Sequence, residues 1–239
     1  MEFMRDIPDK FFDLAVVDPP YGIGVAKMAY TQEENRPCRQ KNGRTLTVKK
    51  LKYKHGEWDS KPADIEYLTE LIRVSKHQII WGINYMDFHL KGGRIIWNKC
   101  TPEGTSFSDC EIAYTSTHER VRLVNYMWAG MCQGKSLSEP TTQQGNKQLN
   151  EKRIHPTQKP IALYRWILTN YAKQGDKIFD SHMGSQSSRI AAYDLGFDYW
   201  GCELDTDYFN DGCNRFNNHI SQLRIDIPVQ PNVEQSKLF

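Results

Sequence analysis

The chain has 239 residues, of which 39% are hydrophobic and 25% are charged, and it carries a formal net charge of +2. A chain of this length and composition can bury one substantial core, so we expect one domain with insertions. No apolar stretch approaches the length of a membrane span, and the charged residues near the N-terminus are not typical of a signal peptide, so we expect none. The near-neutral net charge does not by itself indicate a nucleic-acid partner.

The cysteine pattern predicts the redox environment. The six cysteines include no Cys-x-x-Cys pair and no histidine at a matching spacing. This pattern is typical of a reduced chain without a metal site, so we expect a metal-free, cytoplasmic protein.

The first informative segment is an apolar run at 14–17 that ends in Asp18, Pro19, Pro20 and Tyr21. Four apolar residues bounded by turn formers predict a buried strand, and the two prolines exclude a helix. In open α/β sheets, ligands bind beyond the carboxyl ends of the strands, which is where this tetrapeptide is expected. An acceptor carboxylate, two rigid prolines and an aromatic ring suit a pocket for a flat ring with an amino group. A proline turn capped by Asp18 is the alternative.

A basic segment follows at 25–61. Between residues 36 and 54 it contains no acidic residue. Such a segment can neutralise phosphates and bind nucleic acid independently of sequence, and a disordered, solvated insertion is the alternative. The candidate DNA-binding residues are Arg36, Arg39, Lys41, Arg44, Lys49, Lys50, Lys52 and Lys54.

The middle of the chain predicts alternating elements. Apolar spacing indicates a helix at 65–75, and apolar runs indicate strands at 78–81, 94–97 and 111–114. From Thr115 to Arg153 the pattern dissolves. Polar side chains for base edges and aromatic rings for stacking favour DNA recognition there, with a long irregular surface loop as the alternative. The aromatic and basic residues of this region are Tyr126, Trp128, Arg120, Arg122, Lys135 and Lys147.

A second motif, His155 to Pro160, precedes an amphipathic run that predicts a helix with Pro160 in its first turn. The N-terminus of this helix, with Thr157 and Lys159 nearby, could hold a carboxylate, and a plain capping turn is the alternative. His155 has no predicted ligand partners and is interpreted as structural.

The last pattern predicts a strand at 177–180, a turn around Gly184, a helix, and a further strand that ends in Glu203. Glu203 lies 19 residues after Gly184. In dinucleotide folds an acidic residue binds ribose hydroxyls at an offset of about 20 residues. We therefore predict a nucleotide-type cofactor site, although βαβ units without such a site also contain this spacing.

In this order the motifs resemble those of the amino-methylating DNA methyltransferases of the permuted β type. In that family a D-P-P-Y segment comes first and a variable target-recognition region follows. H-P-T-Q-K-P and D-x-F-x-G-S-G segments then complete the order. The corresponding residues here are Asp18 to Tyr21, about 101–153, His155 to Pro160, and Asp180 to Gln186, within a resemblance that extends from about Asp13 to Arg215.

The resemblance implies a Rossmann-like sheet of seven mostly parallel strands in a domain at 1–225, with S-adenosylmethionine as the methyl donor. It also implies double-stranded DNA as the partner and N6 of a flipped-out adenine as the acceptor. Asp18 and the Pro19 carbonyl would accept hydrogen bonds from the amino group and so aim its lone pair, while Tyr21 stacks on the base. The implied cofactor-binding residues are Asp180, His182, Gly184, Ser185, Glu203, Thr157 and Lys159.

Two positions depart from the family pattern. His182 replaces a phenylalanine, and Gln186 replaces the second glycine, where a side chain is expected to crowd the cofactor if the position requires positive φ. N4-cytosine methylation and a non-catalytic DNA-binding module are alternative functions. The family often has serine in place of the aspartate for cytosine, so Asp18 favours adenine. RNA or protein amide methylation is a weaker alternative, because the basic segment favours nucleic acid over protein.

The tail at 226–239 contains two prolines and lacks a helical period, so we expect it to be flexible. It ends in Gln235, Ser236, Lys237, Leu238 and Phe239, which resemble the Q-x-x-L-F peptides that bind the bacterial sliding clamp. Chance agreement of three residues is the alternative.

We expect deletion of residues 235–239 to abolish binding of the chain to the sliding clamp in surface plasmon resonance. The deletion removes a hydrogen-bonding glutamine and two apolar anchors. DNA binding serves as the control and is expected to be unchanged. Clamp binding that survives the deletion would rule out this interaction.

Overall fold

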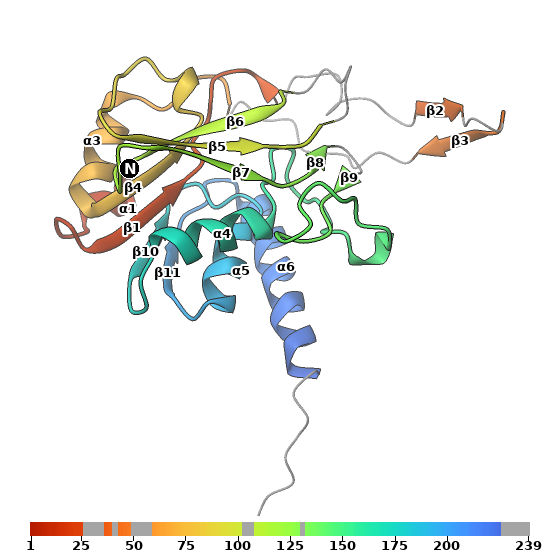
Figure 1. The fold of residues 1–239 in the computed structure, drawn as a ribbon. Helices are drawn as coiled ribbons and strands as arrows, with labels where there is room; N and C mark the ends of the chain where they lie inside the picture. Colours follow the sequence, from red (N-terminus) through yellow and green to blue (C-terminus); the bar gives the residue numbers. More distant parts are fainter. Residues whose placement is uncertain (26–35, 40–42, 49–58, 102–107, 130–131, 226–239) are drawn as a thin grey trace, which may run out of the picture.

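The computed structural model of the chain describes residues 1–25, 36–39, 43–48, 59–101, 108–129 and 132–225. Within these residues the main sheet has seven strands in the order β11-β10-β1-β4-β6-β5-β7, and helices cover both of its faces (Figure 1). This architecture confirms the predicted seven-stranded, mostly parallel α/β fold. The strands are β1 Phe12–Val17, β4 Ser75–Trp81, β5 Gly93–Asn98, β6 Cys110–Thr115, β7 Val121–Asn125, β10 Lys177–Asp180 and β11 Asp198–Gly201.

Strand direction decides which residues meet at one edge of this sheet. β1 pairs in parallel with β4 and β10, and β10 pairs in parallel with β11. β6 is antiparallel to both β4 and β5, whereas β7 runs parallel to β5. The start of β6 therefore lies at the edge where its neighbours β4 and β5 end.

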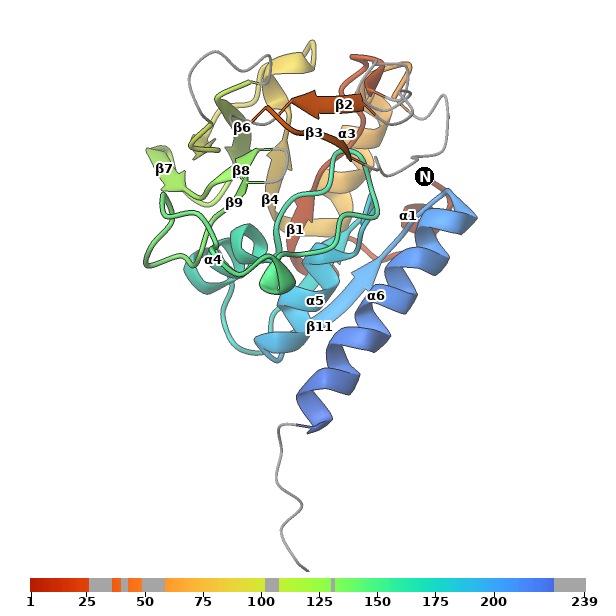
Figure 2. The same ribbon diagram turned by 90° about the vertical axis from the view of Figure 1, so that its right-hand side faces the viewer.

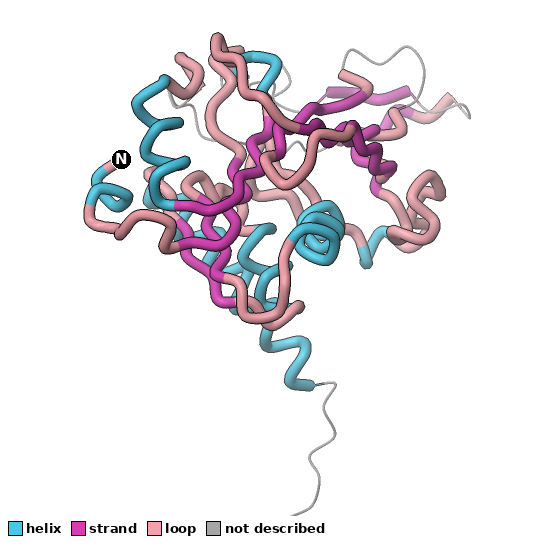
Figure 3. The backbone as a smooth tube through the Cα atoms, turned by 60° about the vertical axis from the view of Figure 1, so that its left-hand side comes forward, coloured by secondary structure: helices cyan, strands magenta, loops and turns pink. Residues whose placement is uncertain are grey.

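Helices lie on both faces of the sheet (Figure 3). Two hydrophobic clusters, one on each face, hold them there. Leu163 of α4 and Ala191 of α5 pack in the same cluster as Leu14 of β1. On the opposite face, Leu71 of α3 packs in a cluster with Val17. Both faces of β1 are therefore buried, as is usual for a central parallel strand. The helices are α1 Glu2–Arg5, α3 Ile65–Val74, α4 Ile161–Tyr171, α5 Ser187–Asp194 and α6 Thr206–Ile225, with 3-10 turns η2 Ile83–Tyr85 and η3 Lys147–Leu149.

Most predicted elements are present with small shifts at their ends. The predicted strands and helix in the first half are β1, α3, β4, β5 and β6, and those in the second half are α4, β10, α5 and β11. Strand β11 ends at Gly201, so Glu203 follows the strand instead of closing it.

The prediction that 115–153 is irregular was wrong in part. It contains β7, which adds an edge strand to the main sheet, and the short hairpin β8 Trp128–Ala129 with β9 Cys132–Gln133. The side chains of Val121 and Leu123 are exposed, at 65% and 60%. An edge strand with exposed apolar residues lacks the alternation from which strands are predicted.

A separate hairpin lies within the basic segment. It consists of β2 Arg36–Arg39 and β3 Thr45–Val48, which pair antiparallel. Figure 1 shows the hairpin apart from the main sheet.

Among the described helices, none is long and apolar enough to cross a membrane. No group of three or more His, Cys, Asp or Glu side chains in the described part of the chain could hold a metal ion. The described cysteines with free thiols are Cys100, Cys110, Cys132, Cys202 and Cys213.

Helix α6 runs beside α5 (Figure 2), and the side chain of Gln186 packs against α6. Gln186 precedes α5 with φ of +59°, in the left-handed region, and its side chain is buried. Its amide Nε2 donates to the carbonyl of Phe209 at 3.0 Å. A Cβ atom added at Gly212 of α6 would lie 2.6 Å from Cγ of Gln186. The predicted requirement for positive φ is therefore present, and the Gln186 side chain is buried against α6.

We expect Gly212→Ala to destabilise the fold by about 1–3 kcal/mol, because the added methyl group overlaps Gln186. In a Gln186→Gly background the same change is expected to be neutral or stabilising, since alanine has the higher helix propensity. Urea unfolding of both single variants and the double variant measures the coupling. Gly145→Ala is the control, because a Cβ there meets no atom within 4 Å. An equal penalty for Gly212→Ala in both backgrounds would contradict the packing described here.

Candidate active site

Asp18 follows β1 and is largely buried, with 15% of its side chain exposed. Its Oδ1 atom accepts a hydrogen bond from the Tyr21 hydroxyl at 2.6 Å, and the ammonium Nζ of Lys159 lies 2.5 Å from the same oxygen. The Lys159 ammonium also donates to the Tyr21 hydroxyl at 3.0 Å. The predicted acceptor carboxylate and aromatic ring are therefore brought together, with a buried cation beside them.

Two further charged residues complete this group, and the sequence did not indicate either of them. Glu111, near the start of β6, lies 3.0 Å from the Lys159 ammonium through Oε2. Its Oε1 accepts from Lys99, which follows β5, at 3.3 Å. We call Asp18, Glu111, Lys99 and Lys159 the acceptor cluster. The reversed direction of β6 brings Glu111 to the edge at which β1 and β5 end.

The charges of the acceptor cluster balance one another. Burial raises the pKa of Asp18, and the Lys159 ammonium opposes that rise. The pKa of Glu111 lies below its usual value, because Lys159 and Lys99 outweigh the effect of burial. In turn Asp18 and Glu111 outweigh burial at Lys159 and raise its pKa. Lys159 is therefore an ammonium ion at neutral pH.

The ring of Tyr21 lies against a second aromatic ring. Its centroid is 5.0 Å from that of Tyr85, and the two planes are 15° apart. Gly82, which follows β4 with φ of +70°, makes room for this arrangement, since a Cβ there would lie 2.0 Å from the Tyr21 ring. A side chain at position 82 would displace Tyr21 from Asp18.

Asp59 fixes the backbone of the tetrapeptide from the far end of the basic segment. Its Oδ1 atom accepts the N–H groups of Tyr21 and Gly22 at 2.8 and 2.9 Å, and its Oδ2 accepts that of Val25 at 2.9 Å. The carboxylate is 3% exposed. Nothing in the sequence pattern indicates this contact, because 37 to 38 positions separate Asp59 from Tyr21 and Gly22.

The predicted cofactor loop lies at the end of the neighbouring strand, β10. Asp180 is fully buried; its Oδ2 accepts from the Ser188 hydroxyl at 2.6 Å, and its Oδ1 accepts from the N–H of His182 at 3.0 Å. Burial raises the pKa of Asp180 to about 7. Gly184, with φ of +43°, donates its N–H to Glu203 Oε2 at 2.8 Å. The structure thus brings Asp180, Gly184 and Glu203 together as predicted.

His182 and Ser185 have distinct surroundings. The Nδ1 atom of His182 is 2.9 Å from the hydroxyl of Ser181, which contacts the Tyr67 hydroxyl at 2.7 Å. Burial lowers the pKa of His182 to about 4, so its ring is neutral at physiological pH. Ser185 is buried, and its carbonyl accepts from Arg215 at 2.7 Å. A hydrogen-bonded imidazole therefore stands where the family usually has a phenylalanine.

The segment from His155 to Lys159 reaches both parts of the site. The His155 ring lies 3.8 Å from the position of a Cβ on Gly184, and its Nδ1 is 3.1 Å from the Thr157 hydroxyl. Lys159, at the other end of the segment, joins the acceptor cluster. The Gln158 side chain, whose Oε1 accepts the N–H of Ile154 at 3.0 Å, holds the segment in a turn.

Lys159 and the start of α4 differ from their predicted role as binders of a cofactor carboxylate. The Lys159 ammonium contacts two carboxylates of this chain, Asp18 and Glu111. The first N–H of α4, on Ile161, donates to Glu151 at 3.0 Å, and Glu151 is paired with Arg215 at 2.8 Å. The Lys159 ammonium and the N-terminus of α4 thus already bind acidic side chains of the protein.

Only part of the predicted DNA-binding surface can be described. Arg36 and Arg39 lie in β2, and Arg44 lies between β2 and β3 on the projecting hairpin. Lys41, Lys49, Lys50, Lys52 and Lys54 lie outside the described residues.

The aromatic residues predicted to stack on bases lie in the protein core. Tyr126 and Trp128 are 6% and 5% exposed, and both belong to the cluster that also contains α4. The indole N–H of Trp128 donates to the carbonyl of Gln158 at 2.8 Å. The aromatic pattern of this region therefore supports the His155–Lys159 segment and offers no stacking surface in this structure.

Known proteins share this fold and sequence pattern. A family model described as DNA methylase, for N6 and N4 methylation, matches residues 95–213. The Type II methyltransferase M.HinfI of Haemophilus influenzae is 25% identical over 252 residues, which cover 88% of this chain. The chain spans 64% of the length of that curated relative.

Two solved structures are also similar to this chain. The PvuII DNA methyltransferase, described as cytosine-N4-specific, is 11% identical with a TM-score of 0.51, covering 92% of this chain and 87% of that one. The M1.HpyAVI–SAM complex is 19% identical with a TM-score of 0.48, covering 89% and 92%. Over residues 95–213 the chain is therefore similar to the amino-methylating DNA methyltransferases, and the order of the motifs and the geometry of the site agree with that match.

Proposed function

We propose that the chain transfers a methyl group from S-adenosylmethionine to the exocyclic N6 of adenine in DNA. The observation that carries this proposal is the placement of Asp18 and Asp180 at the ends of adjacent parallel strands. The His155–Lys159 segment contacts both parts, Gly184 at one end and Asp18 at the other. An amino group on Asp18 and a cofactor on the Gly184 loop would thus be neighbours.

The residues of the Gly184 loop fit S-adenosylmethionine. Glu203 offers carboxylate oxygens to ribose hydroxyls beside the Gly184 N–H, which is the chemistry of a nucleoside site. The Gln186 side chain is buried and bonded to α6, so it does not project from the loop. Asp180, Gly184 and Glu203 are the residues that would hold the cofactor. When bound, it supplies an electrophilic methyl group on a sulfonium centre.

The protein contributes orientation and hydrogen-bond acceptors. A carboxylate accepts hydrogen bonds only, so ionised Asp18 together with the Pro19 carbonyl can hold both hydrogens of an amino group. These bonds draw the nitrogen lone pair out of conjugation and fix its direction. In this structure the Tyr21 hydroxyl donates a hydrogen bond to Oδ1 of Asp18. An amino group that binds this oxygen would therefore replace the Tyr21 hydroxyl. Tyr21, once released, offers its ring for stacking on the base.

Asp18 supports adenine over cytosine as the target base. The fold itself does not decide between them, since a protein described as cytosine-N4-specific has a similar fold. In the family, serine often occupies this position for cytosine. The basic residues of the hairpin support double-stranded DNA as the partner. The predicted cytoplasmic location is part of the same proposal.

We expect DNA from cells that express the chain to carry N6-methyladenine in one short sequence motif. Single-molecule sequencing reports the base, its position and the motif together. Cells that carry an empty vector are the control. N4-methylcytosine in place of N6-methyladenine would overturn the choice of base, and unmodified DNA together with no calorimetric binding of S-adenosylmethionine would overturn the enzyme.

We expect Asp18→Ala to lower kcat by a factor of about 100 or more, because the hydrogen-bond acceptor that orients the amino group is lost. DNA affinity, measured by fluorescence anisotropy, is expected to stay within about twofold, since Asp18 lies away from the basic hairpin. The matched control is Asp198→Ala, an exposed carboxylate at the start of β11. A non-catalytic binding module has no methyl transfer for Asp18→Ala to remove.

A further inference from the structure

Lys159 is an unusual constituent of an acceptor site. Its side chain is 3% exposed, and its ammonium lies between two carboxylates, 2.5 Å from Asp18 and 3.0 Å from Glu111. A buried ammonium is stable only when its charge is paired and its hydrogens are bonded. With the Tyr21 hydroxyl as a third partner at 3.0 Å, its three N–H donors match three acceptors.

Asp18 needs a definite charge state to act in the proposed reaction. As a carboxylate it only accepts hydrogen bonds, whereas a carboxylic acid presents an O–H donor to the amino group. Burial and neighbouring acids both favour the protonated form. The group therefore requires a fixed cation nearby if it is to remain ionised at neutral pH.

We propose that Lys159 and Glu111 are positioning residues that set the charge of Asp18 in opposite directions. Lys159 holds Asp18 ionised and in place for the amino group, while Glu111 holds Lys159 and offsets part of its charge. The inference rests on the proposed methyl transfer and adds to it how the acceptor carboxylate is kept competent.

The geometry of the acceptor cluster supports this division of roles. Glu111 spans two ammonium groups, with Oε2 on Lys159 and Oε1 on Lys99 at 3.3 Å. Lys99 is more exposed than Lys159, at 13% against 3%. The positive charge of Lys159 is thus shared between Asp18 and Glu111. Lys99 neutralises the part of the negative charge of Glu111 that Lys159 does not.

Other ionisable groups also interact electrostatically with Asp18, in addition to Lys159. They come from α3, α4 and β10 as well as from the tetrapeptide itself. They are Tyr21, Tyr67, Tyr164 and Asp180, in addition to Lys159 and Glu111. Asp180 is a further carboxylate: burial raises its pKa to about 7, and the negative charge of Asp18 adds to that rise.

The test compares the pH dependence of kcat/KM in Lys159→Met and Glu111→Gln with that of the unchanged protein. Activity requires ionised Asp18, so it is lost as the pH falls through the pKa of Asp18. We expect Lys159→Met to move the acidic limb upward by about one pH unit or more, and Glu111→Gln to move it downward. Lys159→Arg, which keeps the charge, is expected to restore most of the Lys159→Met shift.

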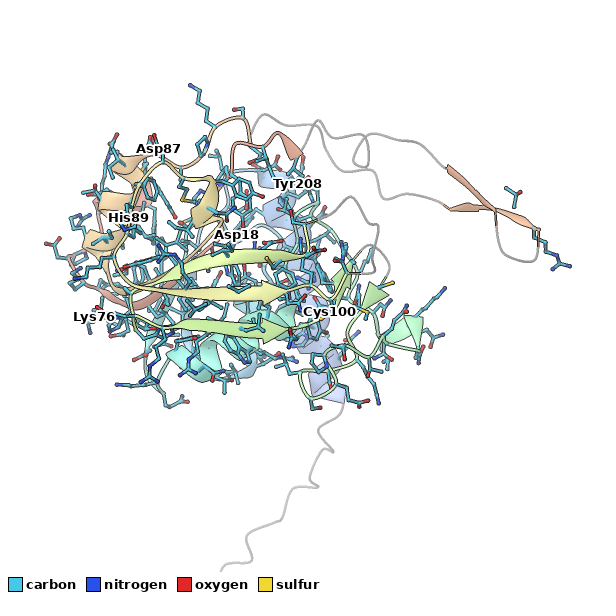
Figure 4. All side chains as sticks on the ribbon, turned by 45° about the horizontal axis from the view of Figure 1, so that its top comes forward. Asp18, Lys76, Asp87, His89, Cys100 and Tyr208 are labelled. Atoms are coloured by element: carbon cyan, nitrogen blue, oxygen red, sulfur yellow. The ribbon has the colours of Figure 1, made fainter. Side chains whose placement is uncertain are left out.

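Lys76→Met is the control variant. Lys76 lies at the start of β4, far from Asp18 in Figure 4, and pairs with Asp13 at the surface at 2.6 Å. We expect it to leave the acidic limb unmoved. Opposite shifts in Lys159→Met and Glu111→Gln are a signature that a merely structural role does not produce.

A second readout separates this inference from the proposed function. Carbon-13 NMR titration of the aspartate carboxyl groups, with Asp18 identified from the spectrum of Asp18→Asn, follows its charge without cofactor or DNA. If the Asp18 titration moves upward in Lys159→Met and downward in Glu111→Gln, the inference is supported. If these shifts are observed but no methyl transfer is detected, the inference stands and only the proposed function is overturned. Methyl transfer with both titrations unmoved, or moved in the same direction, overturns the inference. Should Lys159→Met fail to fold, the downward shift in Glu111→Gln decides alone.

Discussion

The site depends on one buried ammonium. Lys159 connects the segment before α4 to the residue after β1 and to the start of β6, because Asp18 and Glu111 both lie within hydrogen-bonding distance of it. Removing one partner from such a buried group leaves an uncompensated charge, which costs more than the pair contributes. The same pairing that holds these elements together also opposes the effect of burial on the pKa of Asp18.

Contacts between segments that are distant in the sequence hold the loops of the site in place. Adjacent parallel strands bring Asp18 and Asp180 to one edge, but a sheet edge alone leaves the loops free to diverge. The His155–Lys159 segment, held by the Gln158 turn and the indole of Trp128, contacts both loops and removes that freedom. Asp59 does the same for Tyr21 by holding its N–H group. Preorganisation of this kind reduces the entropy lost when reacting groups are brought together.

The groups that could be predicted from the sequence are those with a local sequence pattern. Apolar runs and turn formers located β1 and β10, and with them Asp18 and the Gly184 loop. Glu111 could not be found in this way, because it lies near the start of a strand and becomes a neighbour of Asp18 only when that strand is reversed. Asp59 and Lys99 act through contacts between distant segments that no spacing encodes. The prediction that Tyr126 and Trp128 stack on bases was wrong for a related reason. Composition does not distinguish a ring that stacks on a ligand from one that packs in the core.

Gln186 shows how a departure from a motif can keep the backbone conformation of a loop. The motif position requires a left-handed backbone, which costs a residue other than glycine about 1–2 kcal/mol. Two side-chain hydrogen bonds, to Phe209 and Arg189, offset this cost, and each is worth about 1 kcal/mol net. The space for the side chain comes from Gly212, a glycine on a different helix. The backbone conformation of the loop can therefore form without glycine, because a glycine on another helix leaves space for the side chain.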